Sequence, residues 1–441
     1  MCEEVGTDLL AEREPTQDET NETLSESNAG LAKNSDSDSS ELFDNTNLSH
    51  STDLTSDDED ETTPFEQVYP MSSSQSRMWF PYQLLQDKTT YNCTTSYRLR
   101  GPLNVDRYEA ALKTVIHKHQ TLRTGFYTDP YLGHPMQAVA KSSPFQLKKV
   151  CNALEDVDSA RETGMIAKHI YDLEHEDVFV ATLLEYNSNY HEIIFGYHHI
   201  IMDGVSWQLF LQEVERFYVN PPKRVYQSID YLDFAVKQRA DLDSPAIQTK
   251  REFWKSSFAD LPPPIPLFPF AKVTNRKSLN RYEATETFIE LDQALVARIK
   301  TVAVDNKSTT FHFYLTALQI MARRLLKIDD VCIGITDANR SEQAFMETIG
   351  LMLDSLPLRF KSDGTVDEEF NACLQSTRTA VYSALGNSGV PLDVILDDIG
   401  VETSTSHLPL FQILVNYRMG AIKQKTLGPD IDFEYLAYKD T

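Results

Sequence analysis

The chain lacks a long hydrophobic run. Its 441 residues include no apolar stretch near the roughly 20 residues that a membrane-spanning helix needs, and Val178–Leu184 is among the longest. The N-terminus is acidic and has no basic segment followed by an apolar one, so no secretory signal is indicated. These absences predict a cytoplasmic protein without a membrane partner.

Cysteine is scarce, and no glycine-rich phosphate loop is present. The five cysteines are scattered without the spacing of disulfide or metal pairs: Cys2, Cys93, Cys151, Cys332 and Cys373. This usage is typical of a reducing compartment, and each cysteine is interpreted as a small buried apolar residue. The sequence therefore predicts neither a bound metal nor a bound cofactor.

Positive charge is also in short supply. The net charge is −25, which argues against nucleic acid as a partner. Most of this charge lies in residues 1–63, which hold 19 acidic side chains against Arg13 and Lys33, with Phe43 as their only aromatic residue. Because such a segment buries too little apolar surface to offset its ordering entropy, it is predicted to be disordered. It is either a dispensable tail or a flexible acidic linker between modules.

Two successive sets of helical and strand patterns follow, in residues 64–260 and 261–441, with the proline-rich stretch Leu261–Pro266 as a stiff bridge. Apolar spacing of three or four predicts helices at Asn104–Gln120, Ser206–Tyr218, Tyr231–Ala240, Gln248–Phe258, Gln293–Val304, Thr310–Leu326, Val366–Leu385 and Pro391–Ile399. Strands are predicted at Val178–Tyr186, Glu192–Tyr197, Phe288–Leu291, Val331–Ile335, Leu356–Phe360, Phe411–Tyr417 and Ile431–Tyr435. This alternation predicts an α/β protein with two lobes and a cleft between them.

The most informative segment is His198–Gly204, which places two histidines and an aspartate between a predicted strand and a predicted helix. A histidine presented from such a junction can act as a base near neutral pH. From these residues alone a structural role stays open, because short motifs also match by chance. A zinc site is disfavoured, since adjacent histidines point to opposite sides of a strand and no His-x-x-x-His or Cys-x-x-Cys partner is present.

Seven stretches between about Tyr69 and the C-terminus occur in the order of a known motif set: Ser72–Trp79, Lys118–Phe126, His198–Trp207, Tyr231–Ala235, Ile349–Ser355, Pro391–Asp393 and Pro409–Gln412. They resemble the condensation domain of nonribosomal peptide synthetases, in the form found in fungal polyketide–nonribosomal peptide hybrid synthetases. An ordered set of motifs is a far more specific signal than any one of them.

The resemblance implies two chloramphenicol-acetyltransferase-like lobes that form a V around a central tunnel. It implies an acyltransferase that forms an amide bond between an acyl or polyketide thioester and the amine of an amino acid, in secondary-metabolite biosynthesis. Both substrates would arrive on phosphopantetheine arms, one on an acyl carrier protein of a polyketide synthase module and one on a peptidyl carrier protein. The sequence has no adenylation, carrier or thioesterase motif of its own.

The resemblance also assigns roles in the active site. His199 would be the catalytic histidine, which takes a proton from the attacking amine or stabilises the tetrahedral species. Asp203 would be structural and paired with Arg340, the counterpart of a family arginine. A buried pair of this kind is costly to break from one side, so both residues would be needed.

Four further residues are assigned less chemical roles. Gly204 would let the backbone turn sharply where the loop meets the helix. His198 belongs to the catalytic motif but is expected to pack or to form a hydrogen bond rather than to transfer a proton. Ser206 would line the tunnel or simply belong to the first turn of the helix, and Arg123 would order the lobe near the tunnel.

The sequence departs from the family pattern at its end. Thr403 and Ser404 replace the usual Arg and Asp, and the chain stops soon after Tyr435, so the second lobe is expected to be truncated with an exposed sheet edge. Three rivals therefore remain. One is an acyltransferase acting on a free alcohol or amine. Another is an epimerisation domain, whose second Glu-Gly-His-Gly stretch is not found. The third is a truncated, non-catalytic docking domain.

Overall fold

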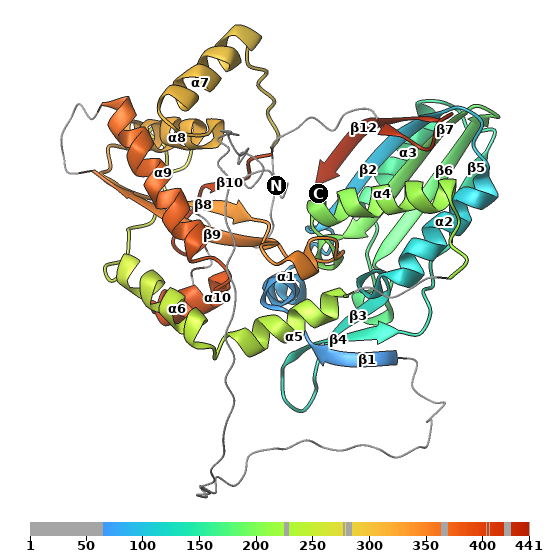
Figure 1. The fold of residues 1–441 in the computed structure, drawn as a ribbon, viewed down its shortest axis with the longest axis horizontal. Coiled ribbons are helices and arrows are strands. Elements are labelled where there is room, and N and C mark those ends of the chain that lie inside the picture. The colour runs from blue at the N-terminus through green and yellow to red at the C-terminus, as the bar shows by residue number, and fades with distance from the viewer. Residues whose placement is uncertain are drawn as a thin grey trace, which may run out of the picture. The chain divides into compact units, whose positions relative to one another are not determined.

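The computed structural model describes residues 65–224, 229–276, 278, 285–362, 369–402, 404, 406–418 and 425–440 (Figure 1). The acidic segment 1–63, predicted to be disordered, lies outside the described residues. Across the described residues helices and strands alternate in two successive sets, so the predicted α/β class is confirmed.

The first set contains six helices and seven strands. Its helices are α1 (Ser73–Leu84), α2 (Val105–Lys118), α3 (Val157–Ala167), α4 (Gly204–Val219), α5 (Tyr231–Asp241) and α6 (Pro245–Ser257). Its strands are β1 (Phe65–Pro70), β2 (Asn92–Arg100), β3 (Thr124–Thr128), β4 (Pro135–Ala140), β5 (Lys148–Cys151), β6 (Phe179–Asn187) and β7 (Tyr190–His198).

The second set follows the proline-rich bridge. Its helices are α7 (Gln293–Asp305), α8 (Thr310–Leu326), α9 (Phe370–Gly386) and α10 (Leu392–Asp398). Its strands are β8 (Asp330–Asp337), β9 (Asp354–Lys361), β10 (Leu414–Val415), β11 (Lys425–Thr426) and β12 (Asp432–Asp440). Strand β8 lies between β10 and β9 in a three-stranded sheet, against which α8 and α9 pack.

The main sheet of the first lobe has the strand order β11-β12-β2-β7-β6-β5, and β1, β4 and β3 form a small separate sheet. Alternation along β7 sends successive side chains to opposite faces of the main sheet. Phe195 packs in the core with Phe210 of α4, whereas Ile194 packs on the other face with Ile166 of α3. Strand β7 is therefore buried on both faces, and this packing fixes the position of His198, the residue at which the strand ends.

The C-terminal strand corrects one expectation. The sequence pattern predicts Ile431–Tyr435 as a strand of the second lobe, but β12 pairs antiparallel with β2 in the main sheet of the first lobe (Figure 1). The physical reason is the packing of Phe433, whose ring stacks on Tyr97 of β2 at 4.5 Å between ring centroids. The end of the described chain thus crosses back and covers one edge of the first sheet.

Two further strand predictions also need correction. Phe288–Leu291 has the alternation of a strand, but it has no strand partner among the described residues, and Phe288 is 88% exposed. Alternation alone does not make a strand, because the backbone groups need a neighbour with which to pair. The stretch Phe411–Tyr417 pairs only at Leu414–Val415, parallel to β8.

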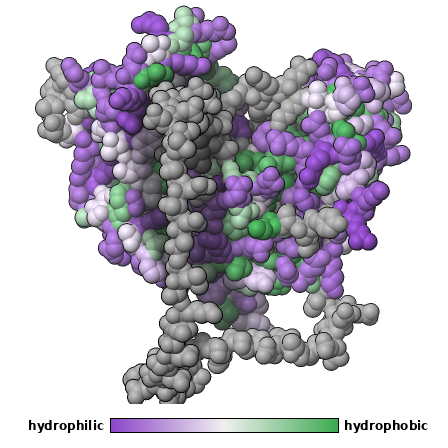
Figure 2. Space-filling view, viewed as in Figure 1, coloured by the Kyte–Doolittle hydropathy of each residue, from purple (hydrophilic) through white to green (hydrophobic). Residues whose placement is uncertain are grey.

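The described surface is mostly hydrophilic, and the described helices do not have the character of membrane spans. Figure 2 shows one face, on which hydrophilic side chains cover most of the described surface and hydrophobic ones form small groups. No helix in the described ranges combines the length and the apolar character needed to cross a bilayer.

Candidate active site

The His198–Gly204 segment lies at a junction of strand, turn and helix. Strand β7 ends at His198, a 3₁₀ turn spans His199–Ile201, and α4 begins at Gly204. The turn is anchored by two hydrogen bonds. The backbone N–H of His199 donates to the carbonyl of Tyr91 at 2.9 Å, and the Thr121 hydroxyl donates to the carbonyl of Ile201 at 2.9 Å. The His199 side chain is therefore presented from a rigid turn, as the sequence predicted for this segment.

His198 occupies an aromatic enclosure. It is fully buried, and its ring makes edge contacts with the rings of Tyr82, Tyr91 and Tyr171. Its Nδ1 accepts a hydrogen bond from the backbone N–H of Ile200 at 3.2 Å, which places the proton of the neutral ring on Nε2. Burial, reinforced by the neighbouring His199, lowers the pKa of His198 to about 3. A ring that stays neutral and enclosed in this way fits a packing role better than proton transfer.

Asp203 closes the other end of the turn. It caps α4, because its Oδ1 accepts a hydrogen bond from the backbone N–H of Ser206 at 2.8 Å. The same oxygen lies 3.2 Å from Nη2 of Arg340, and Oδ2 accepts from the backbone N–H of Met352 at 3.0 Å. Both charged side chains are 1% exposed. The carboxylate is thus fully engaged within the protein.

Arg340 supplies the matching half of this contact. Its Nη1 donates to the carbonyl oxygens of Phe345 at 3.0 Å and Thr348 at 2.7 Å, while Nη2 donates to Asp203 and to the Ser206 hydroxyl. The guanidinium therefore joins the turn after β8 to the first turn of α4. The structure brings together the two residues that the family resemblance had paired.

Two other predicted site residues have different surroundings. Arg123 is fully buried, and its side chain bonds to Glu66 and to the carbonyls of His117 and Ala140 rather than to the His199 turn. Gly204 is the first residue of α4 and is not among the described glycines with positive φ. The role expected of Gly204 in the turn from loop to helix therefore stays a prediction.

The sequence did not reveal how three residues meet beside this site. The Ser206 hydroxyl lies 3.0 Å from the backbone N of Gly350 and 2.7 Å from its carbonyl oxygen. A Cβ on Gly350 would lie 1.9 Å from Cδ2 of Tyr231, so the ring covers this backbone directly. Ser206, Tyr231 and Gly350 each belonged to a recognised motif, but the motifs gave no distances between them.

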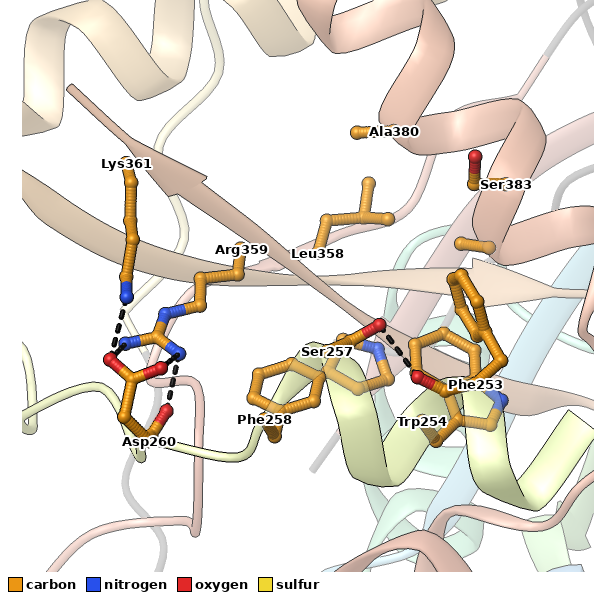
Figure 3. A pocket seen from close by; sticks show the side chains of 12 residues that line it. Phe253, Trp254, Ser257, Phe258, Asp260, Leu358, Arg359, Lys361, Ala380 and Ser383 are labelled. Carbon is orange, nitrogen blue, oxygen red and sulfur yellow. Dashed lines mark hydrogen bonds and ion pairs between the residues drawn. The ribbon is translucent and has the colours of Figure 1, made fainter. Parts of the chain in front are cut away.

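A separate cavity of about 320 Å³ lies between α6 of the first set and β9 and α9 of the second (Figure 3). Aromatic side chains of α6 and its C-terminal cap form one wall, and charged side chains form one end: Phe253, Trp254 and Phe258, then Asp260, Arg359 and Lys361. None of the predicted site residues lines it. The described residues also contain no group of three or more His, Cys, Asp or Glu side chains arranged to hold a metal ion.

Comparison with known proteins identifies the family. The condensation-domain family model matches residues 65–431, so the chain belongs to the condensation-domain family. The chain is 53% identical over 411 residues to the polyketide synthase–nonribosomal peptide synthetase hybrid himA of Aspergillus japonicus, which covers 92% of this chain and 10% of that protein. It is 41% identical over 376 residues to the hybrid synthetase psoA of Aspergillus fumigatus. This alignment covers 85% of the present chain and 9% of psoA. The chain thus spans about a tenth of the length of these curated relatives.

Solved structures show the same fold. The condensation domain from the monacolin K polyketide synthase MokA superposes with a TM-score of 0.74 at 21% identity, over 86% of each chain. The first condensation domain of the CDA synthetase gives a TM-score of 0.65 at 18% identity, over 84% of this chain and 87% of that one. The family resemblance seen in the ordered motifs and the expected condensation-domain fold are both confirmed.

Proposed function

We propose that this chain catalyses amide-bond formation between a carrier-bound acyl thioester and the amine of a carrier-bound amino acid, in the biosynthesis of a secondary metabolite. One observation carries the proposal. The His199 turn is held at its far end by the buried Asp203–Arg340 pair, in a chain that belongs to the condensation-domain family. The names of the fungal relatives join a polyketide synthase to a nonribosomal peptide synthetase, which supports a polyketide acyl donor.

The chemistry needs one base or hydrogen-bonding group and two oriented substrates. The amine nitrogen attacks the thioester carbonyl, the carbon–sulfur bond breaks, and the proton lost by the amine ends on the released thiol. His199 receives that proton or stabilises the tetrahedral species with a hydrogen bond. Because the turn that carries His199 is anchored at Tyr91 and at Asp203, the backbone from which the imidazole projects is held in place, which favours a constant alignment with the substrates.

Both substrates are proposed to arrive on phosphopantetheine arms of carrier proteins. An acyl carrier protein of a polyketide synthase module would deliver the donor to the tunnel between the lobes, and a peptidyl carrier protein would deliver the acceptor. Asp203, Gly204 and His198 then belong to the frame of the site, with Asp203 and His198 already engaged within the protein. We place this reaction in the cytoplasm.

Intact mass spectrometry tests the proposal. The chain is mixed with a hexanoyl-loaded acyl carrier protein and a panel of peptidyl carrier proteins, each loaded with one proteinogenic amino acid. We expect the mass of at least one acceptor carrier to rise by the mass of the acyl group, because the acyl chain is transferred to the amine. The matched controls are His199→Ala and His134→Ala, the latter an exposed histidine on the β3–β4 connection.

The outcomes separate the candidate roles. A mass shift that is lost in His199→Ala and kept in His134→Ala supports condensation by His199. A shift that survives His199→Ala contradicts the assigned chemistry. No shift across the panel, with the far-ultraviolet circular dichroism of a folded protein, overturns the proposal in favour of a non-catalytic docking domain. Acyl transfer to a free amine or alcohol, but not to any carrier, identifies a stand-alone acyltransferase.

A further inference from the structure

Ser206 occupies a junction that its place in the first turn of α4 does not explain. Its side chain is fully buried, and its hydroxyl makes three hydrogen bonds to groups from the second half of the chain. It donates to the carbonyl of Gly350 at 2.7 Å, and it accepts from the backbone N–H of Gly350 at 3.0 Å and from Nη2 of Arg340 at 2.7 Å. One proton and two lone pairs are the full capacity of a hydroxyl, so this one is saturated.

The segment that Ser206 binds is also held by Tyr231, the first residue of α5. The Tyr231 hydroxyl donates to the carbonyl of Leu351 at 2.6 Å and lies 2.6 Å from the hydroxyl of Ser72, the N-cap of α1. The Tyr231 ring packs directly on Gly350. The backbone of residues 350–352 is therefore held by α4 and by α5, and Ser72 ties this part of α5 to α1.

This segment in turn supports the active-site turn. The backbone N–H of Met352 donates to Asp203 at 3.0 Å, and the backbone N–H of Asp203 lies 3.4 Å from the carbonyl oxygen of Gly350. Any displacement of residues 350–352 would therefore reach Asp203, the last residue before α4. His199 lies four residues earlier in the same anchored turn.

We infer that Ser206 is a positioning residue, whose hydroxyl fixes residues 350–352 and Arg340 against α4 and so sets the orientation of His199. The inference rests on the proposed function, because it concerns the rate of the same amide-forming step. A weaker junction would leave the substrates bound but the imidazole less well aligned. Alignment errors of this kind lower the rate of the chemical step more than they lower binding.

The test compares Ser206→Thr with Ser206→Val. The two side chains have nearly the same shape and both add a branch at Cβ at a fully buried site, but threonine keeps the hydroxyl where valine carries a second methyl group. The steric cost of the added branch is therefore shared, and the difference between the variants reports the replacement of the hydroxyl by a methyl group. Ser74→Ala is the matched control, since Ser74 is buried and bonds to the nearby carbonyl of Leu353, which keeps a second bond from Arg77 after the change.

The measurement is the single-turnover rate constant at saturating enzyme, recorded with its amplitude, the dependence on acceptor-carrier concentration and the melting temperature. We expect Ser206→Val to react roughly tenfold to a hundredfold more slowly than Ser206→Thr. Valine cannot bond to the backbone of Gly350 or to Nη2 of Arg340, so these buried polar groups lose a partner. The carrier concentration that gives half the maximal rate should stay unchanged. Ser74→Ala should react at a rate close to that of the wild type.

Two results with the Ser206 variants would overturn the inference. Equal rate constants for Ser206→Val and Ser206→Thr overturn the inference. So does a Ser206→Val protein that loses amplitude and melting temperature but keeps its rate constant, because Ser206 would then serve stability alone. If the wild type forms no amide, the proposed function fails and the inference fails with it. If the wild type reacts and the Ser206 pair does not differ, only the inference fails.

Discussion

Two arginine–aspartate pairs in this molecule have similar lengths and opposite surroundings. Nη2 of Arg340 lies 3.2 Å from Oδ1 of Asp203, and both side chains are 1% exposed. Nη2 of Arg359 lies 3.0 Å from Oδ2 of Asp260, which is 72% exposed at the end of the cavity in Figure 3. The length of an ion pair therefore says little about its contribution, which depends on whether water can reach the charges.

The difference lies in what each charge would do without its partner. Around Asp203 the remaining contacts are backbone and hydroxyl groups that are already in use, so a lone carboxylate or guanidinium would stay buried and uncompensated. Around Asp260 the charged side chains have a second partner or reach solvent. Arg359 also pairs with Asp330 at 2.6 Å, and the exposed ends of Lys361 and Asp260 can be hydrated. The buried pair thus supports the active site, whereas the exposed pair is replaceable.

The largest effect is expected from breaking the buried pair. Arg340→Met should lower the free energy of unfolding by about 3–5 kcal/mol, because it leaves Asp203 as an unpaired buried charge. Urea denaturation followed by circular dichroism measures the loss. The double variant Asp203→Leu with Arg340→Met should be more stable than the single one, since it removes both charges. An Arg340→Met protein as stable as the wild type would show that water reaches this pair after all.

Local features of the fold could be predicted from the sequence, and non-local ones could not. Periodicity located α2, because Tyr108, Leu112 and Val115 face one core, and alternation located β7. The pairing of β12 with β2 joins strands more than 330 residues apart in the chain, a distance that no local pattern spans. Phe288–Leu291 shows the opposite failure of local prediction. Its sequence has a strand pattern, but the described structure offers no neighbouring strand with which it could pair.

The same division applies to the candidate site. The resemblance named His199, Asp203 and Arg340, and the structure brings the last two into contact. The junction at Ser206 depends on the meeting of α4, the 350–352 backbone and Arg340, so it requires coordinates. Arg123 shows the opposite case. Its motif was recognised in the sequence, but its hydrogen bonds go to Glu66 and to the carbonyls of His117 and Ala140.

A second prediction extends the contrast from ion pairs to a buried titratable ring. Burial holds the pKa of His198 at about 3, well below the ordinary value of about 6.5 for an unfolded histidine. Between these values the unfolded chain binds a proton that the folded chain does not. The contribution of His198 to stability is therefore complete above pH 6.5 and is lost as the pH falls toward 3, by at most about 1.4 kcal/mol per pH unit.

The variant His198→Asn isolates this contribution, because asparagine can still accept the bond from the N–H of Ile200 but does not titrate. Urea midpoints measured from pH 7 to pH 4 should fall less steeply for His198→Asn than for the wild type. The carboxylates contribute equally to both proteins, so they cancel in the comparison. The exposed His134→Gln should keep the wild-type slope. Identical slopes for His198→Asn and the wild type would mean that the buried ring is protonated in the folded state.

The smallest effect is expected at the exposed pair. In Asp260→Asn the urea midpoint should match that of the wild type within error, at both low and high salt, because water and salt already screen this carboxylate. Arg359 keeps its contact with Asp330, so the rim of the cavity retains its main ion pair. The matched change Asp203→Asn, which removes one charge from the buried pair, should lower the midpoint clearly. If Asp260→Asn proved as damaging as Asp203→Asn, exposure would not be what separates the two pairs, and the end of the cavity would have to be counted as part of the folding core.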